Sequence, residues 1–236
     1  MSTQKIKSTE VIGSALEIYR EQAGVLIPAA IAVFAIVAIA RLVLTGGAVG
    51  LVSLVALVLG TFYQGMVVEL VGDVQDGRRD SSVSQLFRSV SPVVLPLIGL
   101  AILLGLGVAI GLFLLIIPGL FLLTIWAVAA PSLVIERRGV FAAFGRSREL
   151  VRDNGWEVFG VVLVVVALGL GVAIVVAVVA SGVGTAGNAI LQWVIDVLFA
   201  PFSSLIGAVL YFSLRRMHGE SVTAESPVDG PGLSPS

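Results

Sequence analysis

The chain contains no cysteine and a single histidine, His218, among its 236 residues. The absence of cysteine excludes disulfides, iron–sulfur clusters and thiolate metal sites, and one histidine is too few for a multi-histidine metal centre. Charged residues are also scarce, since they make up 12% of the chain, against about 25% in soluble domains. The net charge of -1 gives no reason to expect nucleic acid as a partner. We therefore expect neither a metal nor another cofactor.

The sequence also lacks the short motifs of common catalytic sites. It contains no GxxxxGK[ST] phosphate loop, no HExxH pair, no GxSxG elbow and no CxxC pair. The charged segments that separate the apolar runs are about 20 residues long, which is too short to bury a catalytic core. We expect a protein that is not an enzyme.

Apolar residues are abundant, at 58% of the chain. A helix needs about 20 apolar residues to cross about 30 Å of hydrocarbon. From Pro92 to Ile135 no charged residue appears in 44 positions, and as one helix this run would be roughly 66 Å long. It must fold back, and Ile117-Pro118-Gly119 is the strong helix breaker near its middle. The sequence predicts six spans, at about 24–44, 48–71, 92–116, 119–135, 156–181 and 189–214.

The predicted fold class is an all-α polytopic membrane protein, with one six-span domain over residues 1–216. The tail, 217–236, is rich in serine, proline and glycine and is predicted to be disordered. A cleavable signal peptide is a competing interpretation of the first 40 residues, because Ala38-Ile39-Ala40 matches a small-residue cleavage pattern. The segment that precedes the first span argues against it, because its charges are balanced.

Lysine and arginine are sorted to alternate connections. Of the 14 basic residues, all except Arg41 fall in the N-terminal segment, the second-to-third and fourth-to-fifth connections, or the start of the tail. Because basic residues favour the cytoplasmic side, we expect both termini to be cytoplasmic. The expected location is the plasma membrane of a prokaryote.

Each predicted cytoplasmic segment contains an amphipathic stretch just before a span. The apolar faces are Val11, Ile12, Ala15, Ile18 and Tyr19 in the first stretch, Val83, Leu86, Phe87 and Val90 in the second, and Val140, Phe144 and Val151, with Phe141 beside them, in the third. In the third stretch, Arg146, Glu149 and Asp153 are predicted to share the opposite, polar face. Such helices lie in the headgroup layer with the apolar side toward the lipid.

The three stretches also end alike. Arg20, Arg88 and Arg152 each lie four residues before the start of a span. The pattern indicates a unit of interfacial helix, span, tight outer turn and span that is used three times, with all copies starting on the same side. The alternative is that any amphipathic segment leading into a membrane helix has this appearance.

Two ionisable residues lie clearly within predicted spans, Arg41 and Asp196. Counting residues along the helices places both in the outer half of the membrane, where we predict that they form an ion pair. In the alternative interpretation Arg41 extends to the headgroups and Asp196 is hydrated in a shallow outer vestibule.

Two glutamates, Glu69 and Glu136, lie near the inner ends of the second and fourth spans. They are candidates to pair with Arg146 or Arg148 and so to dock the third interfacial helix on the bundle. A solvated rim of charges is the alternative, because exposed ion pairs contribute little stability. The GxxxG pattern of Gly107 and Gly111 indicates close helix packing and no more.

One stretch, at about 117–160, resembles a known family. Its motif residues are Pro118, Gly119, Trp126, Pro131, Glu136, Gly139, Arg146, Ser147, Leu150 and Trp156. The stretch is similar to the membrane domain of glycerophosphoryl diester phosphodiesterases and to the related YciC-like inner-membrane proteins. This resemblance implies a multi-span prokaryotic plasma-membrane protein, mostly of unassigned function. The phosphodiesterase domain that some relatives carry is absent from this chain, so its activity is not expected.

Two functions fit these features. The first is a non-catalytic membrane module that binds or regulates a protein or lipid partner, because the arginine-rich cytoplasmic helices suit anionic lipids. The second is a small transporter or channel for a solute or lipid, built from the three hairpins. Two charges together with Gln64 and Gln192 would line such a path poorly, which favours the module.

Overall fold

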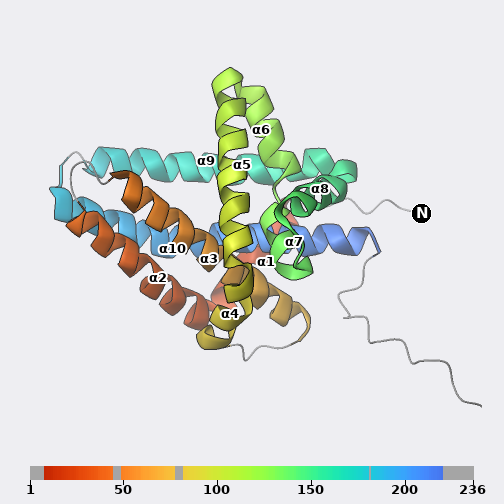
Figure 1. Ribbon diagram of the computed structural model, residues 1–236, viewed down its shortest axis with the longest axis horizontal. Coiled ribbons are helices and arrows are strands. Elements are labelled where there is room, and N and C mark those ends of the chain that lie inside the picture. Colours follow the sequence, from red (N-terminus) through yellow and green to blue (C-terminus); the bar gives the residue numbers. More distant parts are fainter. Residues whose placement is uncertain (1–7, 45–48, 78–81, 181, 220–236) are drawn as a thin grey trace, which may run out of the picture.

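The computed structural model describes residues 8–44, 49–77, 82–180 and 182–219, and none of these residues lies in a strand (Figure 1). The longer helices are α2 (Ala23–Val43), α3 (Val49–Gln75), α5 (Val94–Leu114), α9 (Gly155–Ala180) and α10 (Thr185–Met217). The shorter helices are α1 (Ser8–Glu21), α4 (Val83–Val90), α6 (Ile116–Ile125), α7 (Ala129–Glu136) and α8 (Val140–Val151). The predicted disordered tail lies outside the described residues from position 220 onward.

Six helical stretches are long and apolar enough to cross a membrane, which confirms the predicted all-α polytopic fold class. They are Ala23–Val43, Gly50–Gln75, Val83–Leu114, Ile116–Glu136, Val140–Ala180 and Ala186–Met217. In the third and fifth stretches a short amphipathic helix leads straight into the span through a 3-10 turn, η2 (Ser91–Val93) or η3 (Arg152–Asn154).

The turn between the third and fourth spans differs from the prediction. The chain reverses at Leu115, whose backbone is extended (φ -164°, ψ 146°), and α6 begins one residue later. Pro118 therefore lies in the first turn of α6, where proline is tolerated because those N–H groups have no partner within the helix. The predicted breaker residues 117–119 start the helix rather than interrupt it.

The fourth span, predicted as one helix over 119–135, consists of two. The helix α6 ends at Ile125, three residues form a turn, and α7 begins at Ala129. The turn sequence Trp126-Ala127-Val128 contains neither proline nor glycine, so its residues gave no signal of a break.

The three predicted amphipathic stretches form α1, α4 and α8. The start of α4 is fixed by a capping box, in which the Gln85 main-chain N–H donates to Ser82 Oγ (3.4 Å) and the Ser82 main-chain N–H donates to Gln85 Oε1 (2.9 Å). Leu86 and Val90 on α4 are buried, whereas Phe87 of the same predicted apolar face is exposed.

The predicted faces of α8 need a correction. Arg146 was expected on the polar face with Glu149 and Asp153, but it is buried, whereas Phe141 of the apolar side is exposed. The buried face of α8 consists of Ala143, Arg146, Ser147, Leu150 and Val151. The physical reason is that Arg146 meets a carboxylate on α7, so this cation is turned toward the bundle.

The three units pack in a closed cyclic order. Each short helix lies against the second span of the preceding unit: α4 against α3, α8 against α7, and α1 against α10. The second span of each unit also contacts the first span of the next, in the pairs α3–α5, α6–α9 and α10–α2. The second spans meet one another through the contacts of α3, α7 and α10. Each hairpin, with the short helix that precedes it, therefore contacts the other two.

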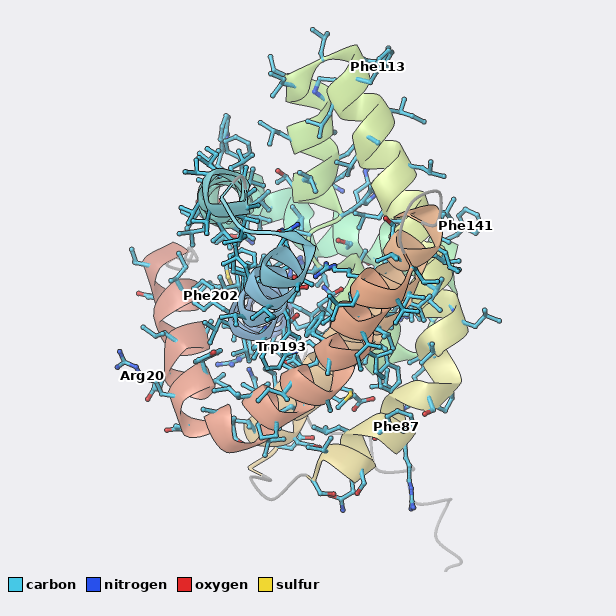
Figure 2. The ribbon with its side chains drawn as sticks, turned by 90° about the vertical axis from the view of Figure 1, so that its left-hand side faces the viewer. Arg20, Phe87, Phe113, Phe141, Trp193 and Phe202 are labelled. Carbon is cyan, nitrogen blue, oxygen red and sulfur yellow. The ribbon has the colours of Figure 1, made fainter. Side chains whose placement is uncertain are left out.

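The α5–α6 hairpin lies across α9 and α10 in Figure 1, and its turn projects from the rest of the molecule. Figure 2 shows Phe113 at the end of this hairpin, where 91% of the residue is exposed. The two helices approach closely because Gly111 lies against Gly119 and Gly107 lies against the Trp126 ring. The apolar surface of the hairpin suits contact with lipid chains.

Candidate functional site

The carboxylate of Glu136, at the end of α7, joins three elements. Its Oε1 atom accepts hydrogen bonds from Arg146 Nε on α8 (2.9 Å) and from the Tyr211 hydroxyl on α10 (2.9 Å). Its Oε2 atom lies 2.8 Å from Arg138 Nε. The side chains of Glu136 and Arg146 are only 12% and 8% exposed, so the two charges stabilise each other where water is scarce.

One of the predicted docking pairs is present, and the second glutamate pairs with an arginine that was not predicted. Glu136 pairs with Arg146, as the sequence suggested. Glu69 instead pairs with Arg137, whose Nη2 atom lies 3.3 Å from Glu69 Oε1 and 3.3 Å from the main-chain oxygen of Ser89 on α4. Arg148 is exposed and pairs with neither of the two glutamates.

The position of Arg137 follows from the backbone at the end of α7. Arg137 has φ 50° and ψ 34°, the left-handed conformation that commonly terminates a helix. Such a conformation is uncommon for a residue with a Cβ atom. Here it accompanies the turn of the chain after Glu136, so that Arg137 reaches α3 and α4 while Glu136 remains against α8 and α10.

A cavity of about 190 Å³ lies beside this network. It is lined from the three second spans and their ends: Glu69, Gly72 and Asp73 from α3 and Asp76 just after it, Ile135 and Arg137 from the end of α7, and Phe212 and Arg215 from α10. We call it the convergence pocket. Its three carboxylates come from α3 and from the residue that follows it, Asp76, and its two guanidinium groups come from the other two walls.

Sequence reasoning missed most of the convergence pocket. The sequence predicts a second span that ends at residue 71, which leaves Asp73 and Asp76 outside it. In the structure α3 continues to Gln75. The spacing of 69, 73 and 76 was the available signal, because residues four and seven apart share one face of a helix.

Ser147 of α8 explains how the fourth span is interrupted. Its Oγ atom donates to the main-chain oxygen of Ile125 (2.9 Å) and accepts from the main-chain N–H of Val128 (3.2 Å). These are backbone groups on the two sides of the turn between α6 and α7. A break at membrane depth requires such partners, because unpaired backbone groups are costly in hydrocarbon.

Most of the family-like motif residues lie near the junction of α6, α7 and α8, whereas Pro118, Gly119 and Trp156 lie away from it. Pro118 and Gly119 lie in the first turns of α6, Pro131 and Leu150 are buried, and Gly139 is the N-cap of α8. The ring centroids of Trp126 and Phe144 are 4.7 Å apart. Trp156, at the start of α9, is exposed. Glu136, Arg146 and Ser147 hold α7 and α8 together, so the part of the motif at this junction serves packing.

The second predicted pair is present at the other end of the spans. Arg41 Nη1 on α2 lies 3.0 Å from Asp196 Oδ2 on α10, and both side chains are 27% exposed. These two helices are neighbours in the cyclic order. The pair therefore joins the first unit to the third.

The described part of the chain contains no group of three His, Cys, Asp or Glu side chains that could hold a metal ion. The polar side chains described above form ion pairs, hydrogen-bond to the backbone at the turn between α6 and α7, or line the convergence pocket. Comparison with known proteins adds nothing to this geometry: no protein-family model, no curated protein and no solved structure matches the chain.

Proposed function

We propose that this chain is a non-catalytic module of a prokaryotic plasma membrane that binds a lipid or protein partner at its cytoplasmic face. Its six apolar helices make it an integral membrane protein. The charged side chains that the structure buries are engaged with one another, as Arg146 is with Glu136. Because these buried charges pair with one another, they support a structural and binding role rather than a catalytic one.

The observation that carries the proposal is the packing of α10 between the convergence pocket and the Arg41–Asp196 pair. Over this length α10 presents Leu205, Ile206 and Val209, all of which are buried. A transport path would need polar side chains here to replace water around a solute. Ser204 is also buried on this length, and a packed segment whose other buried residues are apolar suits a module that stays closed.

Anionic lipid is the proposed partner of the interfacial helices. Arg20, Arg88 and Arg152 are exposed, and each follows or ends a short amphipathic helix. Figure 2 shows the Arg20 side chain pointing away from the bundle. The exposed aromatic residues Phe87 and Phe141 lie on two of these helices and suit the membrane interface. Basic groups at this depth are attracted by anionic headgroups.

Membership of the family resembled at 117–160 is part of the same proposal. Its support is that three of the motif residues make buried polar contacts, since Ser147 holds the α6–α7 turn and Arg146 pairs with Glu136. We also propose that both termini are cytoplasmic. A reporter enzyme fused after Arg216 is expected to be active inside the cell, and activity outside would contradict this orientation.

Lipid retention tests the binding role. Full-length protein in mild detergent is mixed with phosphatidylglycerol, and bound lipid is counted by native mass spectrometry. Replacing Arg20, Arg88 and Arg152 together with glutamine is expected to weaken binding by about a hundredfold, since each basic group near the surface contributes about 1 kcal/mol and the three together about 3 kcal/mol. Arg216→Gln is the control, because Arg216 donates to Gln75 (2.8 Å) and is not on an interfacial helix. Equal binding by the triple variant and the control would contradict the proposal.

A transporter or channel is the alternative function, with the convergence pocket as its inner vestibule. Proteoliposomes loaded with K⁺, Cl⁻ and phosphate distinguish the two. The module is expected to add no flux over protein-free vesicles. Protein-dependent flux that is reduced by changes at Asp73 or Arg215 would establish the alternative.

A further inference from the structure

The turn of the α5–α6 hairpin is apolar throughout and points away from the bundle. Five consecutive large side chains, at residues 113–117, are each between 67% and 91% exposed. No charged residue lies within 20 positions of this turn on either side. A turn that emerges into water is normally built from small and polar residues, because contact between water and large apolar groups is unfavourable. The side chains of this turn therefore fit hydrocarbon.

The turn between α9 and α10 offers a comparison within the same molecule. Its described residues, Gly182, Val183 and Gly184, include two glycines, and the sequence continues with Thr185. Such a turn presents little apolar surface and suits water. The two turns thus differ in the surroundings that their side chains fit.

The backbone of the α5–α6 turn also needs little water. The Leu115 N–H donates to the main-chain oxygen of Gly111 (3.0 Å), and the Gly119 N–H donates to that of Leu115 (3.5 Å). Pro118 has no N–H. A helix begins with four N–H groups that lack a partner within the helix, and at the start of α6 Pro118 and Gly119 account for two of them. Placing this turn in hydrocarbon is therefore less costly than placing an ordinary turn there.

The direction of the hairpin limits how far its turn reaches across the membrane. The hairpin lies across α9 and α10 in Figure 1, and the view turned by 90° in Figure 2 again shows Phe113 at its far end. Helices that lie across one another cannot all follow the membrane normal. With 21 residues, α5 is about 31 Å long and crosses about 30 Å of hydrocarbon only when it is upright.

The neighbouring helices have length to spare. α9 has 26 residues and α10 has 33, so both can cross the membrane while tilted. Any tilt of α5, in contrast, leaves its last turn short of the outer surface. Length, direction and side chains therefore agree on the position of the turn.

We propose that the α5–α6 hairpin is re-entrant. It enters and leaves the membrane on the cytoplasmic side, and its turn at residues 113–117 stays in the hydrocarbon, where lipid acyl chains cover the exposed side chains. Because both ends of the hairpin lie on one side, this arrangement is compatible with two cytoplasmic termini. The inference uses neither the surface arginines nor the convergence pocket, so it does not depend on binding of a lipid headgroup.

The absence of cysteine lets a single introduced thiol report on the turn. Leu115→Cys and Phe113→Cys replace side chains that are 67% and 91% exposed, so neither change removes buried packing. Gly184→Cys is the matched control in the other turn, because a Cβ atom there meets nothing within 4 Å. Each full-length variant carries a nitroxide on its thiol and is reconstituted into vesicles of phosphatidylglycerol and phosphatidylethanolamine. Electron paramagnetic resonance then measures how often the nitroxide collides with oxygen, which concentrates in hydrocarbon, and with a water-soluble nickel chelate.

The two collision rates distinguish lipid, water and protein around the turn. At positions 113 and 115 we expect frequent collisions with oxygen, and collisions with nickel at about a tenth or less of the rate at position 184, because polar solutes are excluded from hydrocarbon. Nickel collision rates equal to that at position 184 would place the turn in water and overturn the proposal. Low rates with both reagents would mean that protein, such as a second copy of the chain, covers the turn, and would overturn the assignment to acyl chains.

Thiol labelling in cells tests whether the turn reaches either surface. A membrane-impermeant maleimide is added to intact cells and, separately, to inside-out vesicles. In both preparations Leu115→Cys is expected to react to less than about one tenth of its extent after denaturation, because the reactive thiolate forms poorly in hydrocarbon. Gly184→Cys is the control for intact cells, and Glu17→Cys, on an exposed position of α1, is the control for inside-out vesicles. If Leu115→Cys reacted as fully as the control in either preparation, the hairpin would not be re-entrant.

Discussion

The Nε atom of Arg146 lies 2.9 Å from Oε1 of Glu136, and these two charges lie where α7 and α8 meet α10. A buried ion pair costs much of its Coulomb attraction in lost hydration. Its contribution therefore depends on how completely the remaining polar atoms find partners. Here Tyr211 also donates to Glu136 Oε1, and Arg146 Nη1 lies 3.2 Å from Glu149 Oε2.

Removing one partner of this pair is expected to be costly. Glu136→Ala leaves Arg146 buried without its main counter-charge, and should lower the free energy of unfolding by about 3–5 kcal/mol. The measurement is an unfolding titration with a denaturing detergent in mixed micelles. Glu17→Gln on α1 is the control, because that carboxylate is exposed and lies outside this network, and it should change stability by less than about 0.5 kcal/mol.

A double variant separates charge from packing. Glu136→Gln with Arg146→Met removes both charges and leaves an acceptor for the Tyr211 hydroxyl. It is expected to be more stable than Glu136→Ala, because neither partner is left as an unpaired charge. A double variant as unstable as Glu136→Ala would show that the ion pair is not what holds α8.

The Arg41–Asp196 pair could be predicted from the sequence. Both residues lie on long uninterrupted helices, so counting residues from the membrane surface gives their depth. The Glu136–Arg146 pair was one of several pairings left open for the third interfacial helix. The pairing of Glu69 with Arg137 was not predictable in the same way. It depends on a left-handed residue at the end of α7, whose sequence there, Glu-Arg-Arg-Gly, does not fix which arginine turns toward α3.

The break in the fourth span could not be predicted from the sequence either, for a related reason. Residues 126–128 carry no breaking signal, and the partners of their backbone lie on another helix. Local propensity cannot report a hydrogen bond to a side chain about 20 positions away. The hydrophobic length of the span was correct, whereas its interruption is a tertiary effect.

Ser147→Ala is expected to destabilise the turn between α6 and α7. The change leaves the Ile125 carbonyl and the Val128 N–H without their shared partner, at a cost of about 1–3 kcal/mol. Hydrogen exchange should show faster exchange at Val128. Ser203→Ala is the matched control, because its hydroxyl donates only within its own helix, to Ala200 O (3.1 Å). Unchanged exchange at Val128 would mean that Ser147 does not support the turn.

A charge swap tests the pair between α2 and α10. Arg41→Asp and Asp196→Arg should each destabilise the chain, because each places two like charges together. The double swap is expected to recover at least about 0.5 kcal/mol relative to either single change, a modest amount because both side chains are 27% exposed. Unfolding titrations of the three variants give the coupling. A double swap no better than the single changes would contradict a stabilising pair.

The α5–α6 hairpin offers a test of close helix packing that involves no charge. A Cβ atom added at Gly119 would lie 2.8 Å from the main-chain nitrogen of Leu112, which cannot move without shifting α5. Gly119→Ala is therefore expected to lower the free energy of unfolding by about 1–3 kcal/mol. Gly105→Ala on the same hairpin is the control, because nothing lies within 4 Å of its Cβ position. Alanine has the higher helix propensity, so this control should be neutral or gain up to about 1 kcal/mol. If both substitutions had the same effect, helix propensity and not the approach of α5 to α6 would account for these glycines.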